Sequence, residues 1–248
     1  MAKPPARPSP AEVLARLRAI HPDAHCELLH DGPFQLLIAT VLSAQTTDVG
    51  VNKVTPALFA AYPDAGALAA ADVHDVEEKI GTLGFFRQKA RNILHLAQRL
   101  VQRHGGQVPR SLAELVELRG VGRKTANVVL GVAWGAPEGV VVDTHVSRIA
   151  QRLGFTRNMD PAKIERDLCA ILPRELWDIA SHTLVFHGRR VCFARKPNCE
   201  GCGINDVCPS AFHAEGVGRK PPRARPSAKA ARTRRTPGRA GVRGYGSS

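Results

Sequence analysis

The chain has 248 residues, of which 44% are hydrophobic and 5% aromatic, and 35 Lys and Arg against 22 Asp and Glu give a net charge of +13. This length allows one large domain or two small ones, with enough apolar residues for a real core. No apolar stretch approaches the roughly 18 residues of a transmembrane helix, and the N-terminus lacks the apolar segment of a secretory signal. We therefore expect no membrane partner and a cytoplasmic protein.

The positive charge is concentrated at the C-terminal end. Ten basic residues and no acidic one follow Gly216, which leaves a net charge of only +3 for residues 1–215. This end is rich in Pro, Gly, Ala and Arg and has too little apolar surface to bury. We expect residues 213–248 to be a disordered basic tail that attracts phosphates non-specifically, or a solvated tail without function. Residues 1–9 are expected to be disordered as well.

Helix signals dominate the remaining sequence. Ser9-Pro10-Ala11-Glu12 combines a capping box with a proline at the first helical position, which predicts a helix through Leu14 to Ile20. Further helices are expected over 34–42, from a cap at Asp48 through Leu58, after Asp64, near Asp72, over 87–104, after a second capping box at 111–114, over 125–134, from Asp160-Pro161 and over 176–190. The one β-branched run, 140–142, is too short for a sheet, so we expect an all-α protein.

A turn with two glycines joins two of these helices, in Gly120-Val121-Gly122-Arg123-Lys124. Successive N–H groups of such a turn can hold a phosphate, which makes Gly120, Gly122 and Arg123 candidates for gripping a DNA backbone. Lys124 begins the second helix and would face the rest of the bound molecule, where an amine can act as a nucleophile. The alternative is an ordinary turn followed by a solvated lysine.

A second candidate for chemistry lies nineteen residues after Lys124, in Val142-Asp143-Thr144-His145. Asp143 follows an apolar run and precedes a helix, so it is either an N-cap or a catalytic carboxylate. One aspartate can be both if the start of the helix faces a cleft. His145 would bind a phosphate or line that cleft, or else pack within its helix.

Four of the six cysteines fall within seventeen residues, at Cys192, Cys199, Cys202 and Cys208, with the spacing C-x6-C-x2-C-x5-C. In an intracellular protein such a group indicates a metal site rather than disulfides. A zinc ion and a [4Fe–4S] cluster both take four cysteines, and the spacing leaves the two open. The other two cysteines lie in apolar surroundings and are expected in the core.

Basic residues flank the first of these cysteines. Arg190 precedes it and Lys196 follows it, and Arg189 and Arg195 add to the charge. A basic loop that is braced by a metal is suited to contact a phosphate backbone. We therefore interpret the metal site as structural rather than redox-active, and Arg190 and Lys196 as DNA contacts.

These segments together resemble endonuclease III, a family of DNA glycosylases in the helix-hairpin-helix superfamily. The resemblance covers roughly residues 10–212 and rests on Leu42-Ser43-Ala44-Gln45-Thr46-Thr47-Asp48-Val49, on the hairpin over 120–129, on 142–145 and on the cysteine spacing. It implies a [4Fe–4S] cluster in place of zinc, and a two-lobed fold. A six-helix barrel would span 28–137, and residues 10–27 with 138–212 would form the iron–sulfur cluster domain.

The resemblance also implies a bifunctional DNA glycosylase and AP lyase of base excision repair. The protein would act as a monomer on double-stranded DNA, associated with a bacterial-type nucleoid, and remove oxidised pyrimidines. The amine of Lys124 would form a Schiff base with the sugar, helped by Asp143, and β-elimination would cut the strand 3′ to the abasic site. Gln45 would fill the gap that the flipped base leaves.

Phe85 stands where the sequence departs from the family pattern. Relatives tend to carry leucine there, whereas this chain has the bulkier and more basic segment over 84–89. Phe85 is either a wedge between bases or a core residue.

Three other functions compete with this interpretation. A mismatch glycosylase that acts on adenine or thymine is expected to lack Lys124. A non-catalytic DNA-binding module needs neither Lys124 nor Asp143. A redox carrier has no need of the basic flanks of the cysteine loop.

Overall fold

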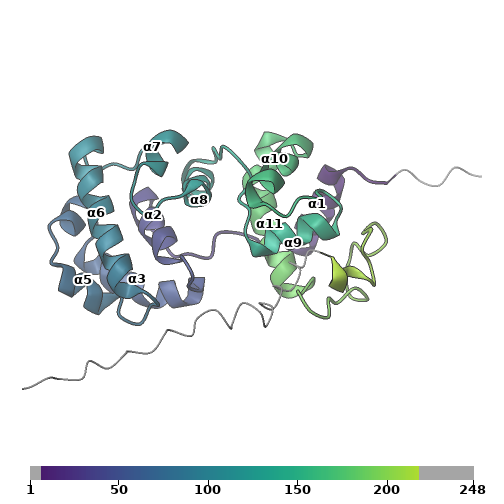
Figure 1. Cartoon of the computed structure of the whole chain (residues 1–248), viewed down its shortest axis with the longest axis horizontal. Helices are drawn as coiled ribbons and strands as arrows, with labels where there is room; N and C mark the ends of the chain where they lie inside the picture. The colour runs from purple at the N-terminus through teal and green to yellow at the C-terminus, as the bar shows by residue number, and fades with distance from the viewer. Residues whose placement is uncertain (1–6, 218–248) are drawn as a thin grey trace, which may run out of the picture.

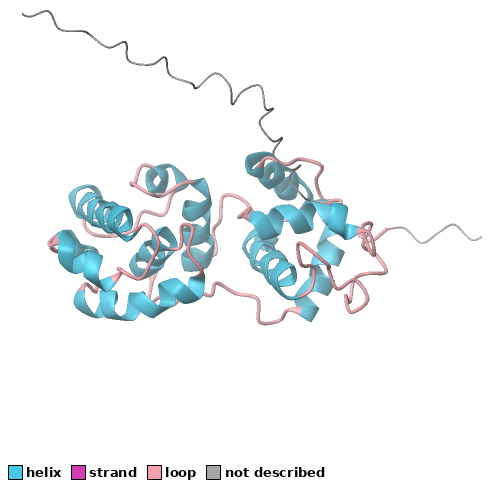
Figure 2. Cartoon of the chain, turned by 60° about the horizontal axis from the view of Figure 1, so that its bottom comes forward, coloured by secondary structure: helices cyan, strands magenta, loops and turns pink. Residues whose placement is uncertain are grey.

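The computed structural model describes residues 7–217 of the chain. These residues form eleven α-helices and two short 3₁₀-helices without any strand, so the prediction of an all-α protein is confirmed (Figure 2). None of the helices among them is long and apolar enough to cross a membrane. In chain order the elements are α1 (Pro10–Ile20), α2 (Pro33–Leu42), α3 (Asp48–Ala61), α4 (Ala65–Ala69), α5 (Val73–Lys79), α6 (Phe86–His104), α7 (Leu112–Val116), α8 (Arg123–Trp134), α9 (Thr144–Arg152), α10 (Pro161–Ile171), η1 (Arg174–Leu176), α11 (Trp177–Arg190) and η2 (Ala214–Gly216).

The helices gather into two lobes that lie side by side (Figure 1). Helices α2–α8 supply most of the first hydrophobic core, whose buried residues run from Leu28 to Leu130. The second core combines Val13 of α1 with apolar residues from Val140 to Ile204. We call the first the barrel lobe and the second the cluster lobe. Because α1 packs against α11, the chain starts in the cluster lobe, leaves it, and returns after α8.

Side-chain caps set several of the helix N-termini. The Ser9 hydroxyl accepts the Glu12 N–H at 3.3 Å, and the Glu12 carboxylate accepts the Ser9 N–H at 2.6 Å, so the first capping box is confirmed. The cap expected at Asp48 is wrong, because Thr47 accepts the Gly50 N–H at 3.2 Å. Asp48 is instead the first residue of α3, and its carboxylate accepts a hydrogen bond from an arginine of the cluster lobe.

Specific contacts hold both ends of the described region. Arg7 belongs to a segment that composition predicts to be disordered, yet it donates to the carbonyl of Leu153 at 2.8 Å. Ala214 is buried, and Arg152 donates to the carbonyl of Val217 at 3.2 Å. The cluster lobe thus provides partners for these residues that composition does not reveal, and the disorder of the two ends stays a prediction. Most of the predicted basic tail lies outside the described residues.

Two glycines allow the lobes to approach each other closely. A Cβ atom at Gly131 of α8 would clash with Oδ1 of Asp178 in α11. A Cβ atom at Gly139, between α8 and α9, would clash with Oε1 of Glu165 in α10. Carboxylates of the cluster lobe thus occupy the space that a larger side chain at either position would need.

Candidate active site and cysteine loop

The glycine turn joins α7 to α8 and places Lys124 in the first turn of α8. Gly120 has φ +83°, a left-handed conformation that glycine adopts without strain. Gly122 is the N-cap of α8, and no side chain caps this helix. The first N–H groups of α8 are therefore available to an anion such as a phosphate.

Lys124 and Asp143 come from opposite sides of the lobe boundary and line the same cleft. This cleft has a volume of ≈ 320 Å³, and Gln45 also lines it. Lys124 is exposed and Asp143 is half-buried, so a molecule that enters the cleft can reach both. Apolar side chains complete the walls, namely Leu28, Val128, Val141, Val185 and Phe186.

Asp143 is the N-cap of α9. Its Oδ1 accepts the Val146 N–H at 2.8 Å, which confirms the capping interpretation. This hydrogen bond fixes the carboxylate at the start of the helix. Because it uses one carboxylate oxygen, the other remains available to the cleft.

Gln45 and Phe85 are exposed residues in left-handed backbone conformations. Their φ angles are +55° and +58°, in a region that non-glycine residues rarely occupy. Phe85 is 72% exposed, so the alternative that it packs in the core is wrong. Unusual backbone at exposed, bulky side chains is the kind of outlier that motivates a functional hypothesis.

Lys89 connects these two residues, and sequence analysis missed it. Lys89 is 5% exposed, and its ammonium donates to Thr46 Oγ1 at 2.5 Å, next to Gln45. The backbone N–H of Lys89 donates to the Phe85 carbonyl at 3.0 Å. Burial lowers the pKa of the Lys89 ammonium. The sequence did carry a signal, since Lys89 lies four residues before Ile93 and so shares the apolar face of α6.

Two residues that the sequence predicts to contact DNA, Arg190 and His145, contact other side chains of the protein. Arg190 donates to both carboxylate oxygens of Asp23 at 2.8 Å. The half-buried His145 has its Nδ1 3.2 Å from Nη2 of Arg148, and burial lowers the pKa of its imidazole. His145 is not among the described residues that line the cleft.

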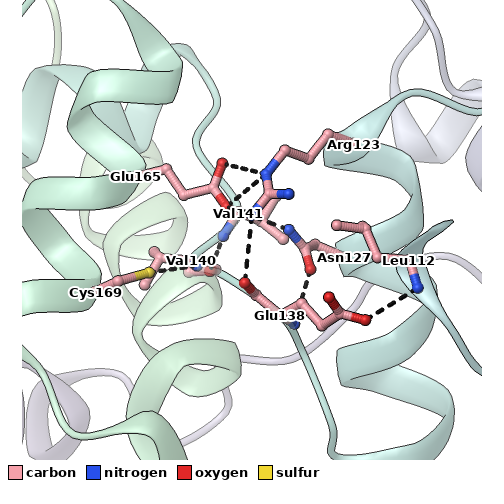
Figure 3. A network of polar contacts seen from close by, with 9 residues as sticks. Leu112, Arg123, Asn127, Glu138, Val140, Val141, Glu165 and Cys169 are labelled. Carbon is pink, nitrogen blue, oxygen red and sulfur yellow. Dashed lines mark hydrogen bonds and ion pairs between the residues drawn. The ribbon is translucent and has the colours of Figure 1, made fainter. Parts of the chain in front are cut away.

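Two further residues that the sequence predicts to contact DNA, Lys196 and Arg123, differ in how far their side chains are engaged within the protein. Lys196 is exposed and has φ +49°, on the loop between the first two cysteines of the group. Arg123 does not extend freely into solvent, because its Nη2 lies 2.8 Å from Oε1 of Glu165 (Figure 3). A role of Arg123 in DNA binding stays a prediction, now with a competing partner inside the protein.

Arg189 also lines the cleft, a position that the sequence did not predict. It lies in the last turn of α11, lines the cleft and donates to Asp48 Oδ2 at 3.1 Å and to Glu27 Oε2. These contacts join α11 to α3 and to the segment before α2. No sequence pattern identifies such a bridge, because its three members are far apart along the chain.

The four predicted cysteine ligands line one apolar cavity. Burial raises the pKa of the Cys202 and Cys208 thiols, and the neighbouring cysteines raise it further. Thiolates gathered in this way therefore need a positively charged metal centre to stay ionised together.

Buried basic side chains brace the cysteine loop. Arg152 is 1% exposed and donates to Cys192 Sγ at 3.2 Å and to the Phe193 carbonyl at 2.7 Å. His187 is buried too, with its Nε2 3.9 Å from Cys202 Sγ. Burial lowers the pKa of His187 to about 4, so the ring is neutral at pH 7. These contacts give His187 a structural role beside the cysteine loop.

The donor set fits an iron–sulfur cluster. A cube of four iron atoms takes four cysteine thiolates at its corners. Cys192, Cys199, Cys202 and Cys208 line one apolar cavity, so their sulfurs can surround one compact cofactor.

Known families match both the helical lobes and the cysteine loop. Residues 38–174 match the family model of the HhH-GPD superfamily base excision DNA repair protein, and residues 192–208 match the iron–sulfur binding domain of endonuclease III. The fold and the site therefore define a helix-hairpin-helix DNA glycosylase of base excision repair.

Similar proteins identify the family within this class. The chain is 52% identical over 200 residues to endonuclease III of Synechocystis sp., covering 81% of this chain and 91% of that protein. Endonuclease III of Bacillus subtilis is 42% identical over 196 residues, covering 79% and 89%. A solved structure of a trapped endonuclease III–DNA covalent intermediate has a TM-score of 0.76 and 45% identity, covering 81% of this chain and 94% of that chain. The chain belongs to the endonuclease III family.

Membership of this family settles the reaction class and the cofactor. The protein is an enzyme that binds DNA, a DNA N-glycosylase and AP lyase. Its cofactor is a [4Fe–4S] cluster held by the loop over 192–208, so zinc, which the cysteine spacing left open, is excluded.

Proposed function

We propose that this enzyme removes oxidised pyrimidines from double-stranded DNA through a Schiff base on Lys124, and then cuts 3′ to the abasic site by β-elimination. The observation that carries the proposal is the position of Lys124 and Asp143 on one cleft between the lobes. The relative that was trapped as a covalent intermediate with DNA is 45% identical to this chain, which supports covalent chemistry here as well.

The reaction starts from a flipped nucleotide, because C1′ of a stacked nucleotide is out of reach. The deprotonated amine of Lys124 donates its lone pair to C1′, and the bond from C1′ to the base breaks. The base leaves with the electron pair of the broken bond and takes up a proton. The nitrogen then loses a proton, and the C1′–O4′ bond opens with protonation of its oxygen, which gives the protonated Schiff base.

Asp143 assists on the other side of the cleft. Its free carboxylate oxygen accepts a proton from the lysine nitrogen and stabilises the positive charge that develops on the sugar. The protonated Schiff base acidifies the C2′ proton. When that proton leaves, a C2′–C3′ double bond forms, the C3′–O3′ bond breaks, and the strand is cut on its 3′ side.

Three groups of residues hold the DNA in this proposal. The N–H groups at Gly120 and Gly122 bind a phosphate, and Gln45 with Phe85 fills the gap that the flipped base leaves. Lys196 adds positive charge on the cysteine loop. The [4Fe–4S] cluster, when bound, holds that loop in shape and takes no part in the steps at the sugar.

Borohydride trapping tests this proposal directly. Reduction of the Schiff base should give a stable protein–DNA adduct with duplex DNA that contains thymine glycol. Lys124→Ala should lose the adduct and the strand cut while it still binds the duplex. Base release without any adduct in the unchanged protein would refute the Schiff base, and equal cleavage by Lys124→Ala would refute the role of this lysine.

Mismatched DNA separates the proposal from the nearest alternative. Duplexes with adenine or thymine in a mismatch should be processed far more slowly than the thymine-glycol duplex. Faster release of a mismatched base, with no adduct, would assign the enzyme to the mismatch glycosylases instead.

A further inference from the structure

Glu165 of the cluster lobe contacts the first turn of α8, one residue from Lys124. Its Oε1 lies 2.8 Å from Arg123 Nη2, and Arg123 Nε lies 3.0 and 3.1 Å from the two carboxylate oxygens (Figure 3). The Glu165 side chain is 12% exposed, so this contact is more shielded from water than an ordinary surface ion pair. A two-pronged contact of this kind also fixes the direction of the guanidinium.

The same network holds the chain where it leaves α8 for the cluster lobe. Arg123 Nη2 donates to the Glu138 carbonyl at 3.4 Å. The buried Asn127 accepts the Glu138 N–H at 2.9 Å through Oδ1, and its Nδ2 lies 3.5 Å from Glu165 Oε1. Glu165 is therefore tied both to the start of α8 and, through Asn127, to the linker that follows α8.

Gly139 makes room for this arrangement. A Cβ atom there would clash with the Glu165 carboxylate, which shows how closely the linker passes the ion pair. The linker continues into Asp143. The network thus spans the two chain segments that carry Lys124 and Asp143 into the cleft.

We propose that Arg123 and Glu165 form a positioning pair. Across the lobe boundary they fix the first turn of α8, so that the Lys124 amine is aligned with Asp143 for attack on the sugar. This inference rests on the proposed nucleophilic role of Lys124. It assigns Arg123 to a contact within the protein, whereas the sequence predicts a DNA contact. Alignment matters because a small displacement of a reacting group slows the reaction far more than it weakens binding.

The test compares Arg123→Gln, Glu165→Gln and the double variant with the unchanged protein. Borohydride trapping on a duplex with an abasic site, under single-turnover conditions, should slow by about tenfold in each single variant. The double variant should slow by the same factor of about ten and not about a hundred, because both substitutions remove one interaction. DNA affinity should change little.

The salt dependence of DNA binding distinguishes the two roles of Arg123. A lost phosphate contact lowers the slope of log affinity against log salt by about 0.9. The positioning role predicts an unchanged slope for Arg123→Gln. A matched control is Arg103→Gln, because Arg103 pairs with Glu117 inside the barrel lobe at 3.6 Å and its side chain is 52% exposed, as is that of Arg123. This control should trap DNA at the original rate.

Gly139→Ala displaces the carboxylate without removing a charge, and it should slow trapping in the same way. Thermal unfolding and cluster absorbance check that each variant is folded. Glu165→Asp, which shortens the side chain by one methylene and so weakens the contact with Arg123, replaces Glu165→Gln if that variant unfolds. Unchanged trapping in the folded Glu165 and Gly139 variants would overturn the inference, as would a slope that falls by about 0.9 in Arg123→Gln. Failure of the unchanged protein to form any adduct would instead overturn the proposed function.

Discussion

Arg152 in the cluster lobe and Lys89 in the barrel lobe are both buried, but the protein satisfies their charges in different ways. Arg152 is 1% exposed and donates to a cysteine sulfur and to several backbone carbonyls. Lys89 is 5% exposed, and Thr46 Oγ1 is the hydrogen-bond acceptor of its ammonium among the described residues.

This difference indicates the role of each cation. A planar guanidinium with many acceptors can stay charged when buried, and it holds the loop that surrounds the anionic cluster. A buried ammonium with one neutral acceptor pays a desolvation cost, in line with its lowered pKa. We infer that Arg152 contributes mainly to stability, whereas Lys89 contributes mainly to the placement of Gln45 and Phe85.

The largest effect is expected for Arg152→Met. This substitution leaves several buried carbonyls and a thiolate without their donor, so the free energy of unfolding should fall by about 3 kcal/mol. Urea unfolding measures it, and visible absorption reports loss of the cluster. Arg16→Met is the control, because Arg16 forms an exposed ion pair with Asp206 at 2.8 Å in the same lobe and should cost less than about 1 kcal/mol. Equal losses in the two variants would contradict a bracing role for Arg152.

Phe85→Ala tests the exposed aromatic residue whose backbone carbonyl accepts a hydrogen bond from Lys89. Because stacking of an aromatic side chain on a base contributes about 1–3 kcal/mol, single-turnover base excision should slow by roughly tenfold or more. The free energy of unfolding should stay within about 0.5 kcal/mol, because Phe85 is exposed. Excision rates opposite adenine and opposite guanine, measured with Phe85→Leu alongside, show whether the aromatic ring sets the tolerance for the opposite base. An unchanged excision rate in Phe85→Ala would remove Phe85 from the DNA interface.

A smaller effect is expected for Lys89→Met. Removal of a buried ammonium relieves its desolvation, so the free energy of unfolding should change by less than about 1 kcal/mol. Excision should slow by about threefold, because the loop that carries Gln45 loses its anchor, equivalent to about 0.7 kcal/mol. Lys53→Met, at an exposed position of α3, controls for the lost charge in the unfolding experiment. A destabilisation as large as that of Arg152→Met would erase the contrast between the two cations.

The smallest effect concerns the pH dependence of stability at His145. Burial holds the pKa of His145 below its ordinary value of 6.5, so the unfolded chain binds a proton more readily than the folded protein. The contribution of His145 to stability is therefore complete above pH 6.5 and is lost as the pH falls through the folded pKa. His145→Gln should show a shallower decline of unfolding free energy over this range. Identical pH profiles for the two proteins would contradict the burial of the imidazole as the cause.

Much of the fold could be predicted because its signals are local. The capping box at Ser9 and the apolar stripe of α6 act within a few residues of themselves, and no strand pattern competes with them. Helix boundaries moved by a residue or two, as at α3, because Thr47 and Asp48 are both good caps and local geometry chose between them.

The candidate site was predictable where one short segment carries the chemistry. The sequence alone determined the glycine turn with Lys124, the cap at Asp143 and the spacing of the four cysteines, since each depends on neighbours along the chain. It also placed Phe85 on the list of possible wedges, although it left the core as an alternative.

Which side chains meet, across the lobes or between helices of one lobe, depends on the tertiary structure. Arg123 pairs with Glu165, Arg189 with Asp48, and Lys89 with Thr46, in each case between residues more than forty positions apart along the chain. The physical reason is that a charge finds its partner by distance in space, and burial selects that partner only after the lobes have packed. Sequence patterns record the periodicity of a helix, but they do not record which helix its polar face will touch.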